Sequence, residues 1–260
     1  MRTVLKRGLM SSLLPALLVA VGCQRAAVPG PASAEFELDA DALQVTGPFA
    51  HENLSVFLIH AENQDDRDFI TLPDGIEQGL VKVSEQAHEQ VGALQVDNRS
   101  DRYLFLQEGD RVVGGKQDRI ITASLVLPPQ SGPTAIRTFC VEQGRWSENG
   151  RGRAFGNAAT ASLAPKAVRG NAKIETDQGN VWRVVKGQKT LAEKKLDAKN
   201  DTTSINPTLD SPQAKKQVQD YASVLQAVAD DHPDVLGVVF VVNGQVEEIN
   251  VCRRRAWCRG

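Results

Sequence analysis

Motifs that would identify a chemistry at sight are missing from this chain of 260 residues. It contains no glycine-rich phosphate loop of the Walker or dinucleotide-binding type, so the sequence predicts no cofactor of that kind. The four histidines, His51, His60, His88 and His232, are scattered and show no HExxH or similar spacing, which leaves a metal site unsupported. The formal net charge is only −2, so nothing in the composition suggests a nucleic-acid partner.

The amino-terminal segment has the layout of an export signal. A basic start precedes the apolar run LMSSLLPALLVAV, which is too short to span a bilayer comfortably as a mature helix. The run ends in VAVGC, and this ending resembles the lipobox of bacterial lipoproteins. The resemblance implies that residues 1–22 are removed and that Cys23 is lipidated, while Gln24 after it implies sorting to the outer membrane. A plain secretory signal with an incidental cysteine is the alternative.

The remaining chain is expected to form a tether, one domain and a tail. Residues 23–35 are rich in Ala, Pro and Gly, which is typical of a flexible linker. A single domain is expected over residues 36–252, because a chain of this length can bury one good core. Residues 253–260 have no periodicity and predict a loose or truncated end. In an oxidising compartment Cys252 and Cys258 could pair, which would leave Cys140 as a buried free thiol.

Short runs rich in β-branched residues predict an α+β fold with a mainly antiparallel sheet or sandwich and a few late helices. Expected strands are ENLSVFLIHAE, the second half of LPDGIEQGLVKVSE, VGALQVDN, YLFLQEG, RIITASLVLPP and AIRTFCVEQ. Residues 179–196 read as a helix, and Ser211-Pro212 begins another, whose apolar face is predicted to be Ala214, Val218, Tyr221, Leu225 and Val228. The final VLGVVFVV-NG-QVEEINV predicts a type I′ hairpin with a central first arm.

Two polar runs flank a predicted pair of strands. EGDRVVGGKQDR, residues 108–119, precedes the first strand, and EQGRW, residues 142–146, follows the second. Antiparallel pairing would bring both runs to one end of the sheet. We therefore predict that Glu108, Lys116, Arg119, Glu142 and Arg145 converge on one site. Three bases against two acids leave one positive charge, which suits a small anionic ligand; a structural network of the same side chains is the alternative.

The side chains in these runs suggest roles. The predicted ligand-binding residues are Lys116, Gln117, Arg119, Arg145 and Trp146. The guanidinium fork of Arg145 suits a carboxylate or phosphate, and Trp146 offers a stacking face. Glu108 and Glu142 are the candidates for acid/base catalysis. No histidine in this stretch could activate Cys140, which favours a buried core role for that thiol.

Residues 106–146 resemble the ARG and rhodanese-phosphatase-superfamily-associated protein domain. The resemblance rests on Glu108-Gly109, Gly114 to Arg119, Pro128 and Cys140 to Trp146, and QGNVWRVV and the final hairpin fit the same layout. Family members are named for associated genes, ADP-ribosylglycohydrolases among them, which implies a link to ADP-ribose or NAD-derived ligands. The chain departs from the family in ending directly after the hairpin, which implies a truncated end. It also departs in its lipobox, because NAD and ADP-ribose are mainly cytoplasmic.

Three functions compete on this evidence. The favoured hypothesis is an envelope-anchored lipoprotein whose domain binds an anionic or ADP-ribose-like ligand. The second is a hydrolase that acts on a phosphorylated or ribosylated substrate. The third is a structural or partner-binding lipoprotein. A shifted pKa inside a cleft would favour the enzyme, an open groove would favour the binding module, and a flat apolar patch would favour the third.

Overall fold

The structure is a computed structural model that describes residues 43–60, 67–86, 92–145, 154–158, 163–174, 177–232 and 234–251, all within one compact unit. The predictions for the signal, the tether and the tail, together with Cys23, Trp146, Cys252 and Cys258, lie outside these residues. Within them, no helix combines the length and the apolar character that a membrane crossing requires.

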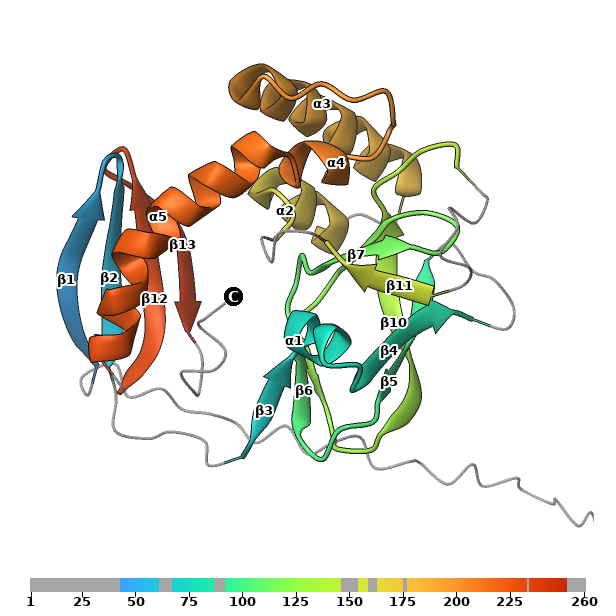
Figure 1. Ribbon diagram of the computed structural model, residues 1–260, viewed down its shortest axis with the longest axis horizontal. Helices are drawn as coiled ribbons and strands as arrows, with labels where there is room; N and C mark the ends of the chain where they lie inside the picture. The colour runs from blue at the N-terminus through green and yellow to red at the C-terminus, as the bar shows by residue number, and fades with distance from the viewer. Residues whose placement is uncertain are drawn as a thin grey trace, which may run out of the picture. The chain divides into compact units, whose positions relative to one another are not determined.

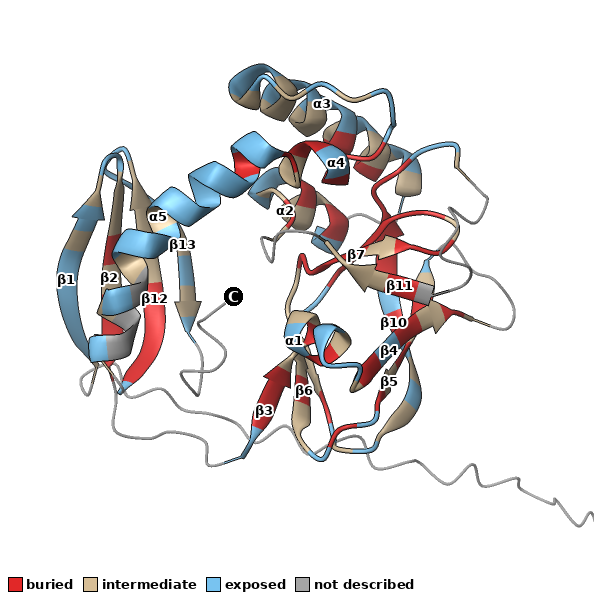
Figure 2. Cartoon of the chain, viewed as in Figure 1, coloured by how far each residue is buried: buried red, intermediate tan, exposed pale blue. Residues whose placement is uncertain are grey.

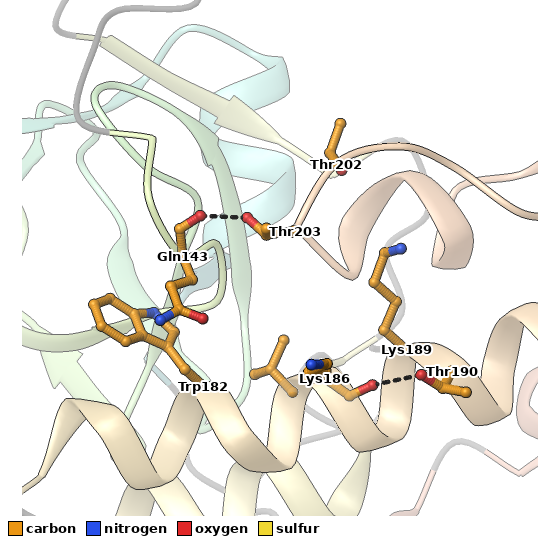
Figure 3. A pocket seen from close by; sticks show the side chains of 8 residues that line it. Gln143, Trp182, Lys186, Lys189, Thr190, Thr202 and Thr203 are labelled. Atoms are coloured by element: carbon orange, nitrogen blue, oxygen red, sulfur yellow. Dashed lines mark hydrogen bonds between the residues drawn. The ribbon is translucent and has the colours of Figure 1, made fainter.

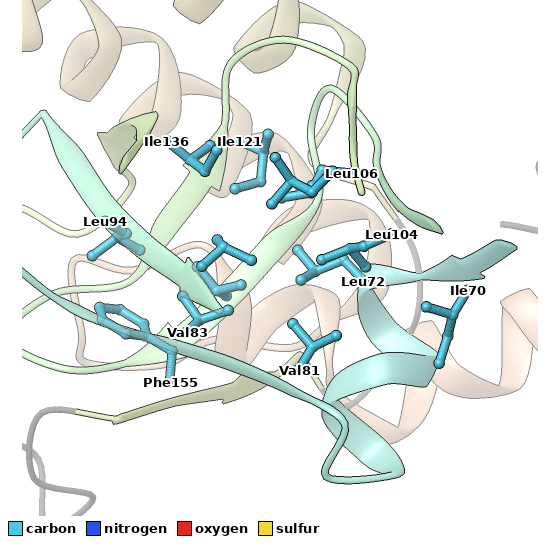
Figure 4. Packing of buried hydrophobic residues seen from close by; sticks show 13 residues of the cluster. Ile70, Leu72, Val81, Val83, Leu94, Leu104, Leu106, Ile121, Ile136 and Phe155 are labelled. Atoms are coloured by element: carbon cyan, nitrogen blue, oxygen red, sulfur yellow. The ribbon is translucent and has the colours of Figure 1, made fainter. Parts of the chain in front are cut away.

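The centre of the fold is a closed antiparallel barrel with the strand order β10-β5-β4-β11-β7-β8 (Figure 1). Its strands are β4 (Val81–Glu85), β5 (Ala93–Asn98), β7 (Arg111–Gly114), β8 (Arg119–Ile121), β10 (Gly132–Cys140) and β11 (Ala154–Asn157). Every second residue of β4 and β5 is buried, as expected for strands with one face inward. Val83, Leu94, Ile121 and Phe155 meet in this core, as Figure 4 shows. Full burial of each such side chain contributes roughly 1.5–3 kcal/mol.

A small sheet extends the same core. It has the order β3-β6-β9, with β3 (Phe69–Thr71), β6 (Tyr103–Leu106) and β9 (Leu125–Leu127). The helix α1 (Leu72–Glu77) begins at Thr71, whose hydroxyl accepts a hydrogen bond from the backbone of Asp74, and Pro73 occupies the first turn. Leu104, Leu106 and Leu127 join the hydrophobic cluster of the barrel.

The sequence reading of RIITASLVLPP as one strand was wrong. The run is divided between β8, in the barrel, and β9, in the small sheet. At the break, the hydroxyl of Thr122 donates to the carbonyl of Arg137, and that of Ser124 accepts from the backbone N–H of Glu108. Hydrogen bonds between side chains and backbone offer the chain an alternative to the backbone pairing of one continuous strand.

A separate four-stranded sheet has the order β1-β2-β12-β13, with β1 (Gln44–His51), β2 (Leu54–His60), β12 (Val235–Val242) and β13 (Gln245–Val251). The predicted hairpin is confirmed, because Asn243 and Gly244 both have positive φ, at 52° and 78°. The predicted central position of its first arm is also confirmed, since β12 pairs with both β2 and β13.

The helix α5 (Pro212–Asp231) covers one face of this sheet, where Leu225 and Val228 pack on Val56 and Leu58. The predicted cap is confirmed, because the hydroxyl of Ser211 accepts from the backbone N–H of Ala214 at 3.2 Å. Val218 is 46% exposed, so the buried stripe of α5 is narrower than the sequence predicted.

Two helices, α2 (Lys166–Ile174) and α3 (Gln178–Leu196), pack beside the barrel, and the short α4 (Asn206–Leu209) follows them. Val168 and Ala172 of α2 and Val181 and Val185 of α3 share a cluster with Ile120 and Phe139 of the barrel. The predicted helix over residues 179–196 is thus confirmed, and so is the α+β class with a mainly antiparallel β core.

Candidate functional site

The two polar runs meet at one end of the barrel, as predicted. β8 and β10 pair antiparallel, with Cys140 opposite Arg119, so the residues before β8 lie beside those after β10. The side-chain amide of Gln117 donates to the carbonyl of Glu142 at 2.8 Å. The backbone N–H of Asp118 donates to Oε2 of Glu142 at 3.2 Å.

Arg145 ties this junction together. Its Nε and Nη2 donate to the two carboxylate oxygens of Glu142, at 2.8 and 2.6 Å, in a bidentate pair. Its Nη1 donates to the carbonyl of Gly115 at 2.9 Å, and Nη2 lies 3.4 Å from Oδ1 of Asp118. Partial burial alone would lower the pKa of Arg145, but the hydrogen bonds and charge of Glu142 outweigh it and raise the pKa above its usual value.

Asp118 links the junction to the segment before α4. Its Oδ2 accepts from Ser204 Oγ at 2.7 Å and from Asn206 Nδ2 at 3.0 Å, and its Oδ1 accepts from the backbone of Gly114 at 3.1 Å. Burial raises the pKa of Asp118, while the hydrogen bonds from Ser204 and Asn206 act in the opposite direction. Arg111 continues the network by donating to Asn206 at 3.0 Å. Residues separated by about 90 positions are thereby joined.

Arg119 lies inside the barrel with no exposed surface. Its Nη1 donates to the carbonyl of Gln117 at 2.8 Å, and its Nη2 lies 3.7 Å from Oε1 of Glu85. The same oxygen of Glu85 accepts from the backbone N–H of Lys116 at 3.1 Å. Sequence reasoning missed Glu85, although an acidic residue at an inward position of β4 was a usable signal.

The backbone between the runs requires glycine at position 115. Gly115 has a φ of 50°, and a β-carbon there would lie 2.3 Å from Cζ of Phe155 and 2.9 Å from Oε1 of Glu85. Any side chain would therefore push the loop off the Glu85–Arg119 pair.

Glu108 does not join this cluster, so the predicted convergence was wrong for that residue. It lies beyond the other end of β8, where Gly109 donates to the carbonyl of Ile121. The Glu108 carboxylate pairs with Lys173 of α2 at 2.9 Å instead. Two acids that the prediction omitted, Glu85 and Asp118, take part in the cluster. With Glu142 they face Arg119 and Arg145, while Lys116 contacts the cluster through its backbone N–H, so the predicted surplus of positive charge is absent from these described contacts.

Cys140 is a buried thiol, as predicted. Burial raises its pKa to about 12, so it does not form a thiolate near neutral pH. The side chain of Gln178 accepts from its backbone N–H at 3.0 Å and donates to its carbonyl at 2.8 Å. Cys140 therefore connects β10 to the start of α3 and is not a poised nucleophile.

A hollow of about 260 Å³ lies beside the turn that carries Gln143 (Figure 3). It is lined by Gln143, Trp182, Val185, Lys186, Lys189, Thr190, Thr202 and Thr203. Figure 3 shows the indole of Trp182 next to Gln143 and the aliphatic stem of Lys189 rising from α3 toward the threonines. The hydroxyl of Thr203 donates to the carbonyl of Gln143 at 2.5 Å, which joins the far wall to the turn that Arg145 holds.

The polar groups of the hollow differ in how far they are engaged. Lys189 Nζ donates to Oε1 of Glu193 at 2.6 Å and to the carbonyl of Asn200 at 3.1 Å. Lys186 is exposed and has no carboxylate partner among the described residues. Trp182 Nε1 is buried and has no hydrogen-bond acceptor within the described part of the chain. Sequence reasoning missed this site, although Trp182, Lys186 and Lys189 share one face of a predicted helix.

A family model, the ARG and Rhodanese-Phosphatase-superfamily-associated Protein domain, matches residues 42–260. None of the curated proteins and none of the solved structures matches the chain.

Proposed function

The chain belongs to the ARG and rhodanese-phosphatase-superfamily-associated protein domain family, and we propose that its domain is a non-enzymatic binding module for a small anionic ligand. The observation that carries the proposal is the hollow beside α3, which is lined by the indole of Trp182 and by Lys186, an exposed lysine without a carboxylate partner among the described residues. The module would be held on the outer membrane by lipid on Cys23, which the sequence VAVGC supports.

The hollow offers a ligand donors and positive charge. Lys186 supplies an ammonium group, and Trp182 supplies the surface of its indole ring, whereas its Nε1 is buried and does not face the hollow. The amide of Gln143 lies on the same wall. An anion with several acceptor oxygens, such as a phosphate monoester, would satisfy these groups together.

The size of the hollow limits the ligand. Sites for drug-sized ligands hold roughly 300–1,000 Å³, and this one holds about 260 Å³. A sugar phosphate fits that space. Of a larger molecule such as ADP-ribose, only one ribose-phosphate end would enter.

We call Glu85, Asp118, Arg119, Glu142 and Arg145 the charged cluster. In the proposal, this cluster supports the wall of the hollow. Gln117 and Arg119 are 4% and 0% exposed. Gln117 donates to the carbonyl of Glu142, next to Gln143, and Arg119 donates to the carbonyl of Gln117, so the two residues support the wall of the hollow from behind. The side chain of Arg145 is 20% exposed, which makes it the predicted residue best placed to add a surface contact. Ligand contact by Lys116, Arg145 and Trp146 stays a prediction.

The hydrolase hypothesis is less well supported. Glu142 has both carboxylate oxygens engaged by Arg145, and Glu108 is paired with Lys173, so neither is placed to act as a catalytic acid or base at the hollow. Burial raises the pKa of Asp110 to about 7, but that carboxyl is not among the residues that line the hollow. These contacts therefore favour ligand binding without catalysis over hydrolysis.

Titration with ribose 5-phosphate, inorganic phosphate and ADP-ribose, followed by calorimetry, tests the proposal. Lys186→Ala should weaken binding of the sugar phosphate by about tenfold or more, because a hydrogen bond to a charged group contributes roughly 1.5–3 kcal/mol. Lys216→Ala is the matched control, since Lys216 is an exposed lysine of α5 outside the hollow. Absence of binding by all three probes, or equal affinity of Lys186→Ala and wild type, would contradict the proposal.

A further inference from the structure

Three side chains of the four-stranded sheet form a hydrogen-bonded chain that the binding site does not use. The hydroxyl of Thr46 lies 2.7 Å from Nε2 of His60, and Nδ1 of His60 lies 3.0 Å from Oδ1 of Asp234. The three residues come from β1, β2 and the turn before β12, and none of them lines the hollow. We call them the Thr46 relay. Its order of hydroxyl, imidazole and carboxylate is that of a nucleophilic triad.

The pairing of the strands brings the relay together. Thr46 is paired with Leu58, two residues before His60, so the side chains of Thr46 and His60 are diagonal neighbours on one face of the sheet. On the other side of β2, His60 is paired with Val235, which Asp234 directly precedes. The relay therefore depends on the register of three strands and not on adjacent residues in the sequence.

A β-bulge directs Thr46. The register between β1 and β2 shifts between Thr46 and Phe49. Within the bulge, Gly47 has a φ of 119°, and a β-carbon there would lie 2.8 Å from the carbonyl oxygen of Val56, so this position requires glycine. The extra residue lets Thr46 and Phe49 point to the same face although they are three positions apart. Bulges redirect side chains in this way and are over-represented next to active sites.

The imidazole of His60 is fixed, while the hydroxyl of Thr46 is accessible. His60 is 7% exposed, and its ring centroid lies 5.6 Å from that of His232, at the end of α5. The ring of His232 is held in turn, because its Nδ1 donates to the carbonyl of Val228 at 2.8 Å. Figure 2 shows most of β1 in the colour of exposed residues beside the more buried β2. A reagent can therefore reach the hydroxyl without moving the base.

The carboxylate of Asp234 sets the direction of the hydrogen bonds. An ionised carboxylate only accepts, so Nδ1 of a neutral His60 carries the proton and donates to Asp234. Nε2 then has a free lone pair and accepts from the hydroxyl of Thr46. The hydroxyl proton already points at the base that would remove it, which is the geometry that general-base activation requires.

We propose that Thr46 is an acyl-acceptor site, in which His60 takes the hydroxyl proton as the oxygen attacks the carbonyl carbon of an ester. The bond between Oγ1 of Thr46 and the acyl carbon forms, and the bond from that carbon to the leaving oxygen breaks. His60 returns its proton to the leaving alkoxide, so the products are acyl-threonine and an alcohol. The step modifies the chain once and needs no turnover, so it stands beside the binding function and does not depend on it.

The charge at the relay selects the class of reagent. The side chain of Asp234 is 61% exposed, and the hydrogen bond from His60 lowers the pKa of this carboxyl, so it is negative near neutral pH. A phosphoryl donor carries negative charge and would be repelled by it. A neutral carboxylic ester is not repelled, and the relay therefore favours acyl transfer over phosphoryl transfer.

Acetylation of the full chain by p-nitrophenyl acetate at pH 7.5, followed by peptide mass mapping over time, tests the proposal. Thr46 should be acetylated about a hundredfold faster than Thr190, because a positioned general base contributes roughly 10²–10⁴-fold. Thr190 is the internal reference, since it is an exposed threonine whose hydroxyl donates to the carbonyl of Lys186 and not to a histidine. Thr46→Val should carry no acetyl group at this position and leave the labelling of Thr190 unchanged.

Two variants separate a base from a structural hydrogen bond. His60→Gln keeps an acceptor for Thr46 and a donor for Asp234 but has no basic nitrogen, so acetylation of Thr46 should fall about a hundredfold. Asp234→Asn changes an exposed side chain, so it should fold with the urea midpoint of wild type and still slow acetylation of Thr46 by about tenfold or more.

Three results would overturn the proposal. Acetylation of Thr46 no faster than that of Thr190 would show that its hydroxyl is not activated. Equal rates in wild type, His60→Gln and Asp234→Asn would reduce the relay to hydrogen bonds that join strands. An acetyl group found on His60 in place of Thr46 would make the imidazole the acceptor.

Discussion

Replacing Arg145 by alanine tests whether the charged cluster braces the end of the barrel. The substitution removes the bidentate pair to Glu142 and the hydrogen bond to the carbonyl of Gly115. It also leaves Glu142 and Asp118 as buried carboxylates without their nearest positive charge. Loss of one partner of a buried pair costs about 3–5 kcal/mol, and the partial exposure of Arg145 places the expected loss near 3 kcal/mol.

Urea unfolding at pH 7 measures this loss. The urea midpoint should fall, while the slope of the unfolding free energy against urea concentration should stay constant, because the substitution does not change the surface area that unfolding exposes. The double variant Arg145→Ala/Glu142→Gln should recover about 1 kcal/mol or more, because it removes the stranded charge. Arg145→Lys should be less stable than wild type, because an ammonium group keeps the charge but cannot form the bidentate pair. A loss below about 0.5 kcal/mol for Arg145→Ala would refute the brace, because that is the range of ordinary surface substitutions.

Three further predictions concern single side chains. Burial raises the pKa of Asp110 from 3.8 to about 7, so folding takes up a proton and the wild type should lose stability as the pH rises from about 4 to 7. Asp110→Asn should therefore be more stable than wild type at pH 8 by up to about 4 kcal/mol and equal to it at pH 4; parallel curves of unfolding free energy against pH would contradict this. Cys140 should resist alkylation by iodoacetamide in the native protein at pH 8 and react on unfolding, as peptide mass mapping would show; rapid native labelling would mean that the thiol is accessible. Cys23→Ser should abolish labelling with a radioactive fatty acid and block removal of residues 1–22; unchanged labelling and processing would disprove lipidation.

Features with local signals were predictable from the sequence. The turn at Asn243-Gly244 and the start of α5 at Ser211-Pro212 depend on adjacent residues, and both were found. The strands β7 and β11 were missed because each has four residues and no room for a period. They are strands because they close the barrel: Phe155 of β11 pairs with Val83 and Gly114, which are far away in the sequence.

The site was predictable only where the strand pairing could be inferred. The meeting of Gln117 and Asp118 with Glu142 followed from the antiparallel pairing of the strands between them. Glu85 was missed because its pairing with Arg119 depends on closure of the barrel. The hollow was missed because its walls come from three segments: the turn at Gln143, the helix α3 and the loop at residues 202–203.

The central claim is that the hollow beside α3 binds an anion while the charged cluster holds its wall. The most direct measurement is a crystal structure of the protein soaked with ribose 5-phosphate. The account predicts density for the phosphate within hydrogen-bond distance of Lys186 Nζ, with the sugar against the indole of Trp182. An empty hollow, or a phosphate bound at Lys116 and Arg145 away from α3, would contradict it.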